Sequence, residues 1–140
     1  MNINSIRKYK SKISQKRLNI LKLHREEYRL IQIIINNDVL LRGTVYKMAG
    51  KCGKSSCKCY KSDYSHEVWR ITKSIGGKAF ARVVPVEDLF KVRNLTWNYK
   101  KFQETKRNLI KIQKEIQKEI KNIEKLKSQE YYGQGIFKTK

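Results

Sequence analysis

The chain has 140 residues, enough for one modest domain, and its 33 Lys and Arg against 12 Asp and Glu give a net charge of +21. Such a charge opposes compaction and favours a polyanionic partner. No apolar run approaches the ~20 residues of a membrane span, and the basic start of the chain lacks the apolar stretch of a signal peptide; we therefore expect a cytoplasmic protein with no membrane partner.

The first part of the chain divides into a basic arm and a helix. Residues 1–12 show no apolar periodicity and are predicted to form a basic N-terminal arm. Over residues 13–36 the apolar side chains recur at helical spacing, which predicts a first helix, and Asn36-Asn37-Asp38 is a stop signal. The apolar stripe of this helix consists of Ile13, Ile20, Leu23, Leu30 and Ile34.

Residues 42–84 have the pattern of a small β-segment. A short strand is predicted at Thr44-Val45-Tyr46, and residues 68–72 and 79–84 alternate as strands do. Gly76-Gly77 lies between the last two runs and is typical of a hairpin turn. The segment therefore predicts a three-stranded antiparallel sheet, which is about the minimum for a sheet with one packed face.

Residues 85–130 predict a long second helix. Pro85 suits a first turn, and Glu87 and Asp88 complement the positive end of the helix dipole. The second half carries a narrow, heptad-like stripe that requires a partner helix: Leu109, Ile112, Ile116, Ile120 and Ile123. That partner is either the first helix or a second copy of the chain. Because the stripe outruns the shorter first helix, we predict a homodimer through residues 85–130, followed by a flexible tail over residues 131–140.

These elements make an α+β fold: two long helices, as a helical hairpin or coiled coil, flank a small three-stranded antiparallel sheet with a cysteine-rich knuckle. The knuckle holds Cys52, Cys57, Cys59 and His66 in the spacing C-x4-C-x-C-x6-H, and four such ligands could close a tetrahedral shell around a structural zinc ion. Neighbouring lysines are expected to lower the thiol pKa values and to favour metal capture. The alternatives are three free thiols in a basic loop, or a redox pair at Cys57 and Cys59.

Several short motifs follow one another along residues 42–102: Arg42-Gly43-Thr44, Cys52-Gly53-Lys54, Cys57-Lys58-Cys59, His66, Gly76-Gly77-Lys78 and Val84-Pro85. Together they resemble an uncharacterised family of short proteins from bacteria, archaea and mobile elements. Its members have the pattern RG[ST]…CGK..C.C…H…GGK…VP before a long helix. This sequence departs from the family after His66, where Glu67-Val68-Trp69 replaces Gly-Pro-Tyr. The resemblance implies the architecture and no activity.

The middle segment is also the most basic part of the chain. Residues 42–82 contain ten Lys or Arg and two acidic residues, and several of these cations adjoin aromatic side chains. Cations hold phosphates and exposed aromatic rings stack on unpaired bases. The predicted nucleic-acid-binding residues are Lys47, Lys51, Lys54, Lys58, Tyr60, Lys61, Tyr64, Arg70, Lys73, Lys78 and Arg82. The alternative for Trp69 and Phe80 is that they form the core face of the sheet, and we expect this for both.

No catalytic pattern is visible. The sequence contains no Ser-His-acid arrangement, no P-loop and no Gly-rich dinucleotide fingerprint, so we do not expect an enzyme. The prediction is a nucleic-acid-binding protein, with DNA favoured over RNA, that serves as a mobile-element or phage accessory factor. The alternative is a coiled-coil adaptor that docks on an acidic protein partner.

Overall fold

A computed structural model describes residues 3–131 and 137–139 of the chain. The chain divides into two compact units. The helical unit combines residues 1–36 with residues 104–140, and the sheet unit comprises residues 37–103. Helix α2 (Val86–Lys127) contributes to both units. The predicted set of secondary-structure elements is confirmed, because the described residues contain two long helices and a three-stranded antiparallel sheet.

Helix α1 (Ile3–Ile35) begins ten residues before the predicted position. The prediction of a basic arm over residues 1–12 is therefore wrong for residues 3–12, which are helical. The prediction missed the spacing of Ile6, Tyr9 and Ile13, which recur every three or four residues as in an amphipathic helix. At the other end, the expected stop at Asn36 is confirmed, since the last helical residue is Ile35.

Helix α2 begins directly after Pro85, close to the predicted position. Glu87 and Asp88 lie in its first turn, where carboxylates favour the positive end of the helix dipole. Lys125 and Lys127 lie in its last turn, where cations favour the negative end. Both ends of this 42-residue helix are thus specified by local charge.

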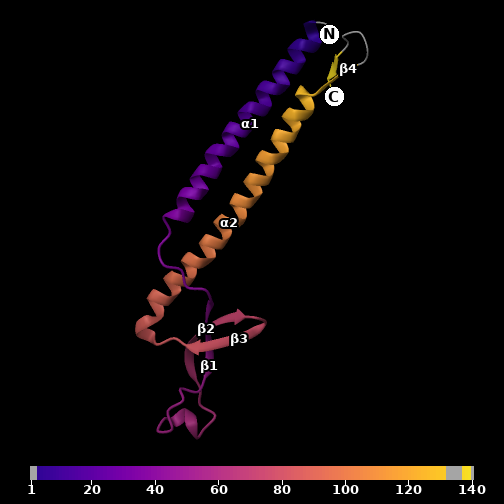
Figure 1. Ribbon diagram of the computed structural model, residues 1–140. Helices are drawn as coiled ribbons and strands as arrows, with labels where there is room; N and C mark the ends of the chain where they lie inside the picture. Colours follow the sequence, from indigo (N-terminus) through magenta and orange to yellow (C-terminus); the bar gives the residue numbers. More distant parts are fainter. Residues whose placement is uncertain (1–2, 132–136, 140) are drawn as a thin grey trace. The chain divides into compact units, whose positions relative to one another are not determined.

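In the helical unit, α1 lies alongside the second half of α2 (Figure 1). Ile13 and Leu30 are buried in this contact, and Ile112, Ile116 and Ile123 of the predicted stripe are half-buried. The earlier start of α1 lets it reach Leu126, which shares a groove with Lys12 of α1. Because α1 covers more of the stripe than expected, the hairpin alternative accounts for most of it. Ile120 stays exposed, and the homodimer stays a prediction.

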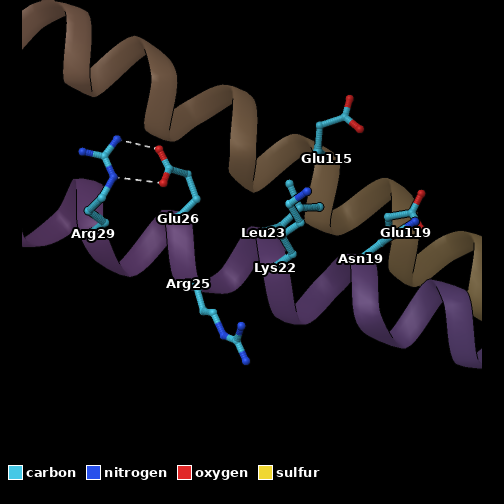
Figure 2. Close-up of a pocket in the computed structure, with 8 residues that line it drawn as sticks. All are labelled: Asn19, Lys22, Leu23, Arg25, Glu26, Arg29, Glu115 and Glu119. Carbon is cyan, nitrogen blue, oxygen red and sulfur yellow. Dashed lines mark hydrogen bonds and ion pairs between the residues drawn. The ribbon is translucent and has the colours of Figure 1, made fainter.

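A polar layer crosses the contact between the two helices. Glu119 is only 9% exposed, and both its carboxylate oxygens lie 3.2 Å from Nζ of Lys16 on α1. Burial raises the pKa of Glu119, but hydrogen bonds from Lys16, Asn19 and Asn122 and the charge of Lys16 outweigh burial, so the pKa lies below its ordinary value. Figure 2 shows the groove beside this layer, with Glu115 and Glu119 on α2 and the Glu26–Arg29 ion pair on α1.

Glu119→Gln is expected to destabilise the protein by about 1 kcal/mol at neutral pH, since Lys16 loses its counter-charge while keeping partial access to water. A group with a lowered folded-state pKa stabilises above its unfolded pKa and loses that effect as the pH falls through the folded value. Thermal unfolding of both proteins from pH 7 to pH 3 should show the difference closing in acid. Glu115→Gln, an exposed neighbour, is the control. An equal difference at pH 3 would contradict the assignment.

In the sheet unit, the strands are β1 (Thr44–Gly50), β2 (His66–Ile75) and β3 (Lys78–Val83), in the order β1-β2-β3. The predicted turn at Gly76-Gly77 is confirmed: both glycines have positive φ, at 56° and 77°, as a type I′ hairpin turn requires. Each strand pair is antiparallel, with Lys47 opposite Trp69 and Lys73 opposite Phe80. Strands β1 and β2 are longer than the runs that the sequence predicted, and β3 matches its predicted run within one residue at each end.

The buried side chains described in the sheet unit are Val68 of β2, Val84, Cys59 of the cysteine loop and Thr96 of α2. Trp69 faces the other side of β2 from Val68 and is half-buried, with the cations of Lys47 and Arg93 at 5.9 and 5.4 Å from its ring, so it packs on the sheet as expected. The expectation that Phe80 faces the core is wrong, because its side chain is 49% exposed. The reason is that β3 is an edge strand whose residues are all exposed.

Beyond α2, short strands β4 (Gln129–Tyr131) and β5 (Phe137–Thr139) pair antiparallel. The flexible tail predicted over residues 131–140 is thus strand at its described positions, and residues 132–136 and 140 lie outside the described residues. Among the described helices, none combines the length and the apolar character that crossing a membrane requires.

Candidate metal centre and basic surface

Three cysteines and a histidine meet in the sheet unit. The Sγ atoms of Cys52, Cys57 and Cys59 and a ring nitrogen of His66 all lie within 4.8 Å of one another. The closest pairs are Cys52 Sγ and Cys59 Sγ at 3.4 Å, and Cys57 Sγ and His66 Nε2 at 3.0 Å. Around a tetrahedral zinc ion with Zn–S bonds of about 2.3 Å, neighbouring sulfurs would be separated by about 3.8 Å. The four side chains could therefore hold a metal ion together.

The register of the sheet brings the ligands together from two strand ends. Gly50, the last residue of β1, lies opposite His66, the first residue of β2. The connection between them, residues 51–65, contains all three cysteines; residues 51–66 are called the knuckle below. A loop of this length with little regular structure needs internal support, and inward-facing ligands around a metal would supply it.

Local turns inside the knuckle bring the three sulfurs toward one another. Gly53 has φ of +82°, a conformation that side chains disfavour, and the backbone N–H of Lys54 donates to the Cys52 sulfur. The N–H of Cys57 then donates to the Lys54 carbonyl at 3.1 Å, and a single 3₁₀ turn (Lys58–Tyr60) carries Cys59 into the interior. Finally, the N–H of Cys52 donates to Sγ of Cys59 at 3.4 Å. Such N–H groups favour thiolate sulfur.

The thiols differ in their electrostatics. The hydrogen bonds from the Lys54 backbone and from Cys59 lower the pKa of Cys52. For Cys59, a backbone hydrogen bond from Cys52 acts downward, but burial and the neighbouring sulfurs outweigh it and raise the pKa. The expectation that nearby lysines lower the thiol pKa values is therefore wrong for Cys59. Its sulfur is fully buried, and the lysine side chains around it are exposed to solvent.

The chemistry of the four groups is compatible with a bound metal ion. Three sulfurs and one imidazole nitrogen form a Cys₃His set, which zinc favours. The sulfurs are not bonded to one another, because a disulfide bond would be about 2.05 Å long and all three cysteines are free thiols.

Lys51 supports the loop rather than facing outward. Its Nζ donates to the carbonyl oxygens of Ser62 and Tyr64 at 2.6 and 2.8 Å, which closes the knuckle across its base. The hydroxyl of Ser62 in turn donates to the Lys58 carbonyl at 2.6 Å. Ser62 was not predicted to have a role, although Ser followed by Asp is a common turn signal.

The predicted nucleic-acid-binding residues fall into three groups. Five lie on the outside of the knuckle and are exposed: Lys54, Lys58, Tyr60, Lys61 and Tyr64. Three lie on one face at the far end of the sheet, as their register with Phe80, Ile71 and Ile75 shows: Lys73, Lys78 and Arg82. The remaining three, Lys47, Lys51 and Arg70, have local roles or a different orientation.

The side chains of the last group bind other residues of the protein or face another side of the sheet. Lys47 forms an ion pair with Glu67 at 2.6 Å, and Lys51 binds the two carbonyls described above. Arg70 is half-buried and lies on the opposite face of β2 from Lys73, since adjacent positions alternate along a strand. The first two groups lie about 20 Å apart along β2, at 3.3 Å per residue. The predicted residues therefore do not form one continuous patch.

Comparison with protein-family models, with curated proteins and with solved structures finds no match for this chain. The family resemblance of residues 42–102 therefore stays a prediction.

Proposed function

We propose that this protein binds nucleic acid through the outer surface of the knuckle, and that a structural zinc ion fixes the shape of that surface. The supporting observation is the set of outward lysines. Lys54, Lys58 and Lys61 are exposed, and within the described part of the chain none of them forms an ion pair with a carboxylate. Three ammonium groups on one short loop attract a polyanion, and phosphates are the usual polyanion for such a surface.

Aromatic rings on the same loop favour nucleic acid over other polyanions. Tyr60 is 62% exposed, so one of its faces can stack on a base. Tyr64 is held in place by an edge contact with His66 at 5.1 Å and by Nζ of Lys58 at 5.1 Å from its ring. A ring that is already held by a metal ligand on one side and a cation on the other has little conformational freedom left to lose on binding.

Zinc is the metal that this ligand set favours. Thiolates and imidazole are soft or borderline ligands, and a four-ligand Cys₃His shell is typical of structural zinc sites. The ion would hold Cys52, Cys57 and Cys59 together and thereby set the spacing of the lysines between and beyond them. With no open coordination position, it supports a binding role and not a catalytic one. A reducing compartment such as the cytoplasm would suit these thiols.

Purified protein, freed of contaminating nucleic acid, is expected to shift 20-nucleotide single-stranded and duplex DNA and RNA probes at physiological salt. The logarithm of the association constant should fall with the logarithm of salt concentration with a slope of about −3 or steeper on duplex DNA, because three lysines each displace counterions at about 0.9 per phosphate. Heparin competition and probe length measure how far the binding is generic. No shift with any probe at physiological salt would refute the proposal.

A further inference from the structure

Helix α2 exposes an apolar face in the sheet unit that the proposed function does not use. Val86 and Phe90 are each 78% exposed, and Trp97 is 58% exposed. They follow the spacing i, i+4, i+11, so they share one side of the helix, and they line a groove with Leu89, Arg93 and Asn94. Exposed Phe and Trp side chains that gather on one face indicate an interaction site, whereas single exposed apolar residues do not.

The charged residues around Phe90 and Trp97 are basic, whereas Glu87 and Asp88 adjoin Val86 in the first turn of α2. Between Leu89 and Lys101 of α2, the charged residues are Lys91, Arg93, Lys100 and Lys101, and none is acidic. Nζ of Lys101 lies 5.0 Å from the Trp97 ring, and Arg93 lies between Phe90 and Trp97 along the helix. A partner that covers Phe90 and Trp97 must therefore place its own charged groups beside ammonium and guanidinium groups.

We infer that the face formed by Val86, Phe90 and Trp97 docks an acidic amphipathic helix of a partner protein. The apolar residues extend for about 17 Å along α2, at 1.5 Å per residue, and form a ridge that fits between the side chains of a second helix. Carboxylates at the edges of that helix complement Lys91, Arg93, Lys100 and Lys101. A second copy of this chain would instead bring a segment of net positive charge against itself, since Val86 to Lys101 contains four basic and two acidic residues.

The inference does not depend on nucleic-acid binding, and its test is a selection from a library of random 18-residue peptides. The library is selected on wild-type protein and counter-selected on the Phe90→Ser/Trp97→Ser variant. Enriched peptides are expected to carry a net negative charge and apolar residues at i, i+4 and i+7. A synthetic copy of the best peptide should bind the double variant at least roughly tenfold more weakly than wild type, because Trp and Phe anchors dominate such interfaces.

Tyr28→Ser/Ile35→Ser is the matched control, since it removes two comparably exposed apolar side chains from α1. This control should bind the peptide as wild type does, and both variants should shift nucleic-acid probes as wild type does. Three outcomes overturn the inference: no enrichment, enrichment of peptides without acidic character, or equal binding to the double variant. A wild-type dimer that Phe90→Ser/Trp97→Ser converts to a monomer also overturns it and assigns the face to a second copy.

Discussion

Protein purified without chelator is expected to contain about one zinc ion per chain. Removal of the zinc ion is expected to unfold the knuckle while leaving the helical unit intact. The physical reason is that residues 51–65 have few other supports: the interior of the loop is a single buried side chain, Cys59, and a few turn hydrogen bonds. Structural zinc contributes on the order of 10 kcal/mol to small metal-dependent folds. Metal analysis and amide exchange before and after chelation measure both effects.

Single substitutions separate the ligands from the loop around them. Cys59→Ser should abolish stoichiometric zinc, because its sulfur is fully buried and lies 3.4 Å from Cys52 Sγ. Ser56→Ala, in the same loop and exposed, is the control and should retain the full metal content. Cobalt substitution provides an independent readout, since a tetrahedral thiolate site colours the ion. A zinc content below about a tenth of an equivalent, with all three thiols of the wild type titrating freely, would refute the metal site.

The features that the sequence predicted correctly are those with a local physical cause. Gly76-Gly77 predicted the hairpin because both positions need positive φ, and Pro85 with Glu87 and Asp88 predicted the start of α2 because charge and φ are fixed there. The cysteine spacing predicted the ligand cluster for the same reason, since Cys57 and Cys59 are too close in sequence to lie far apart. Each of these signals is contained within a few residues.

The features that the sequence did not predict depend on contacts between distant residues. Lys51 was predicted to contact phosphate, but in the fold its ammonium group binds the Ser62 and Tyr64 carbonyls. Lys47 was predicted to contact phosphate too, but strand pairing brings it into an ion pair with Glu67. The separation of Arg70 from Lys73 was available in principle, because residues three apart on a strand face opposite sides. Charge counting along the chain ignored that alternation and therefore predicted one patch where the structure has two groups.

Replacing Lys54, Lys58 and Lys61 together by Glu is expected to weaken nucleic-acid binding by two to three orders of magnitude. Each phosphate contact contributes about 1 kcal/mol at moderate salt, so three losses amount to roughly a hundredfold, and the introduced carboxylates repel phosphate further. The salt slope on duplex DNA should become shallower by about 3, at one unit per lost contact. Electrophoretic shifts over a series of salt concentrations measure both quantities.

The matched control is the same reversal at Lys114, Lys118 and Lys121, which are exposed together on α2 in the helical unit. Each Lys→Glu change removes two charges, so both triple variants go from +21 to +15 and share the same net charge. Any difference in affinity between them therefore reports where the phosphates lie and not how basic the protein is. Both should keep their zinc, because neither touches a ligand.

If the helix triple abolishes binding and the knuckle triple does not, the knuckle is the wrong site. If neither changes anything because no probe binds, the adaptor function replaces the nucleic-acid one, and the apolar face of α2 becomes the principal interaction site.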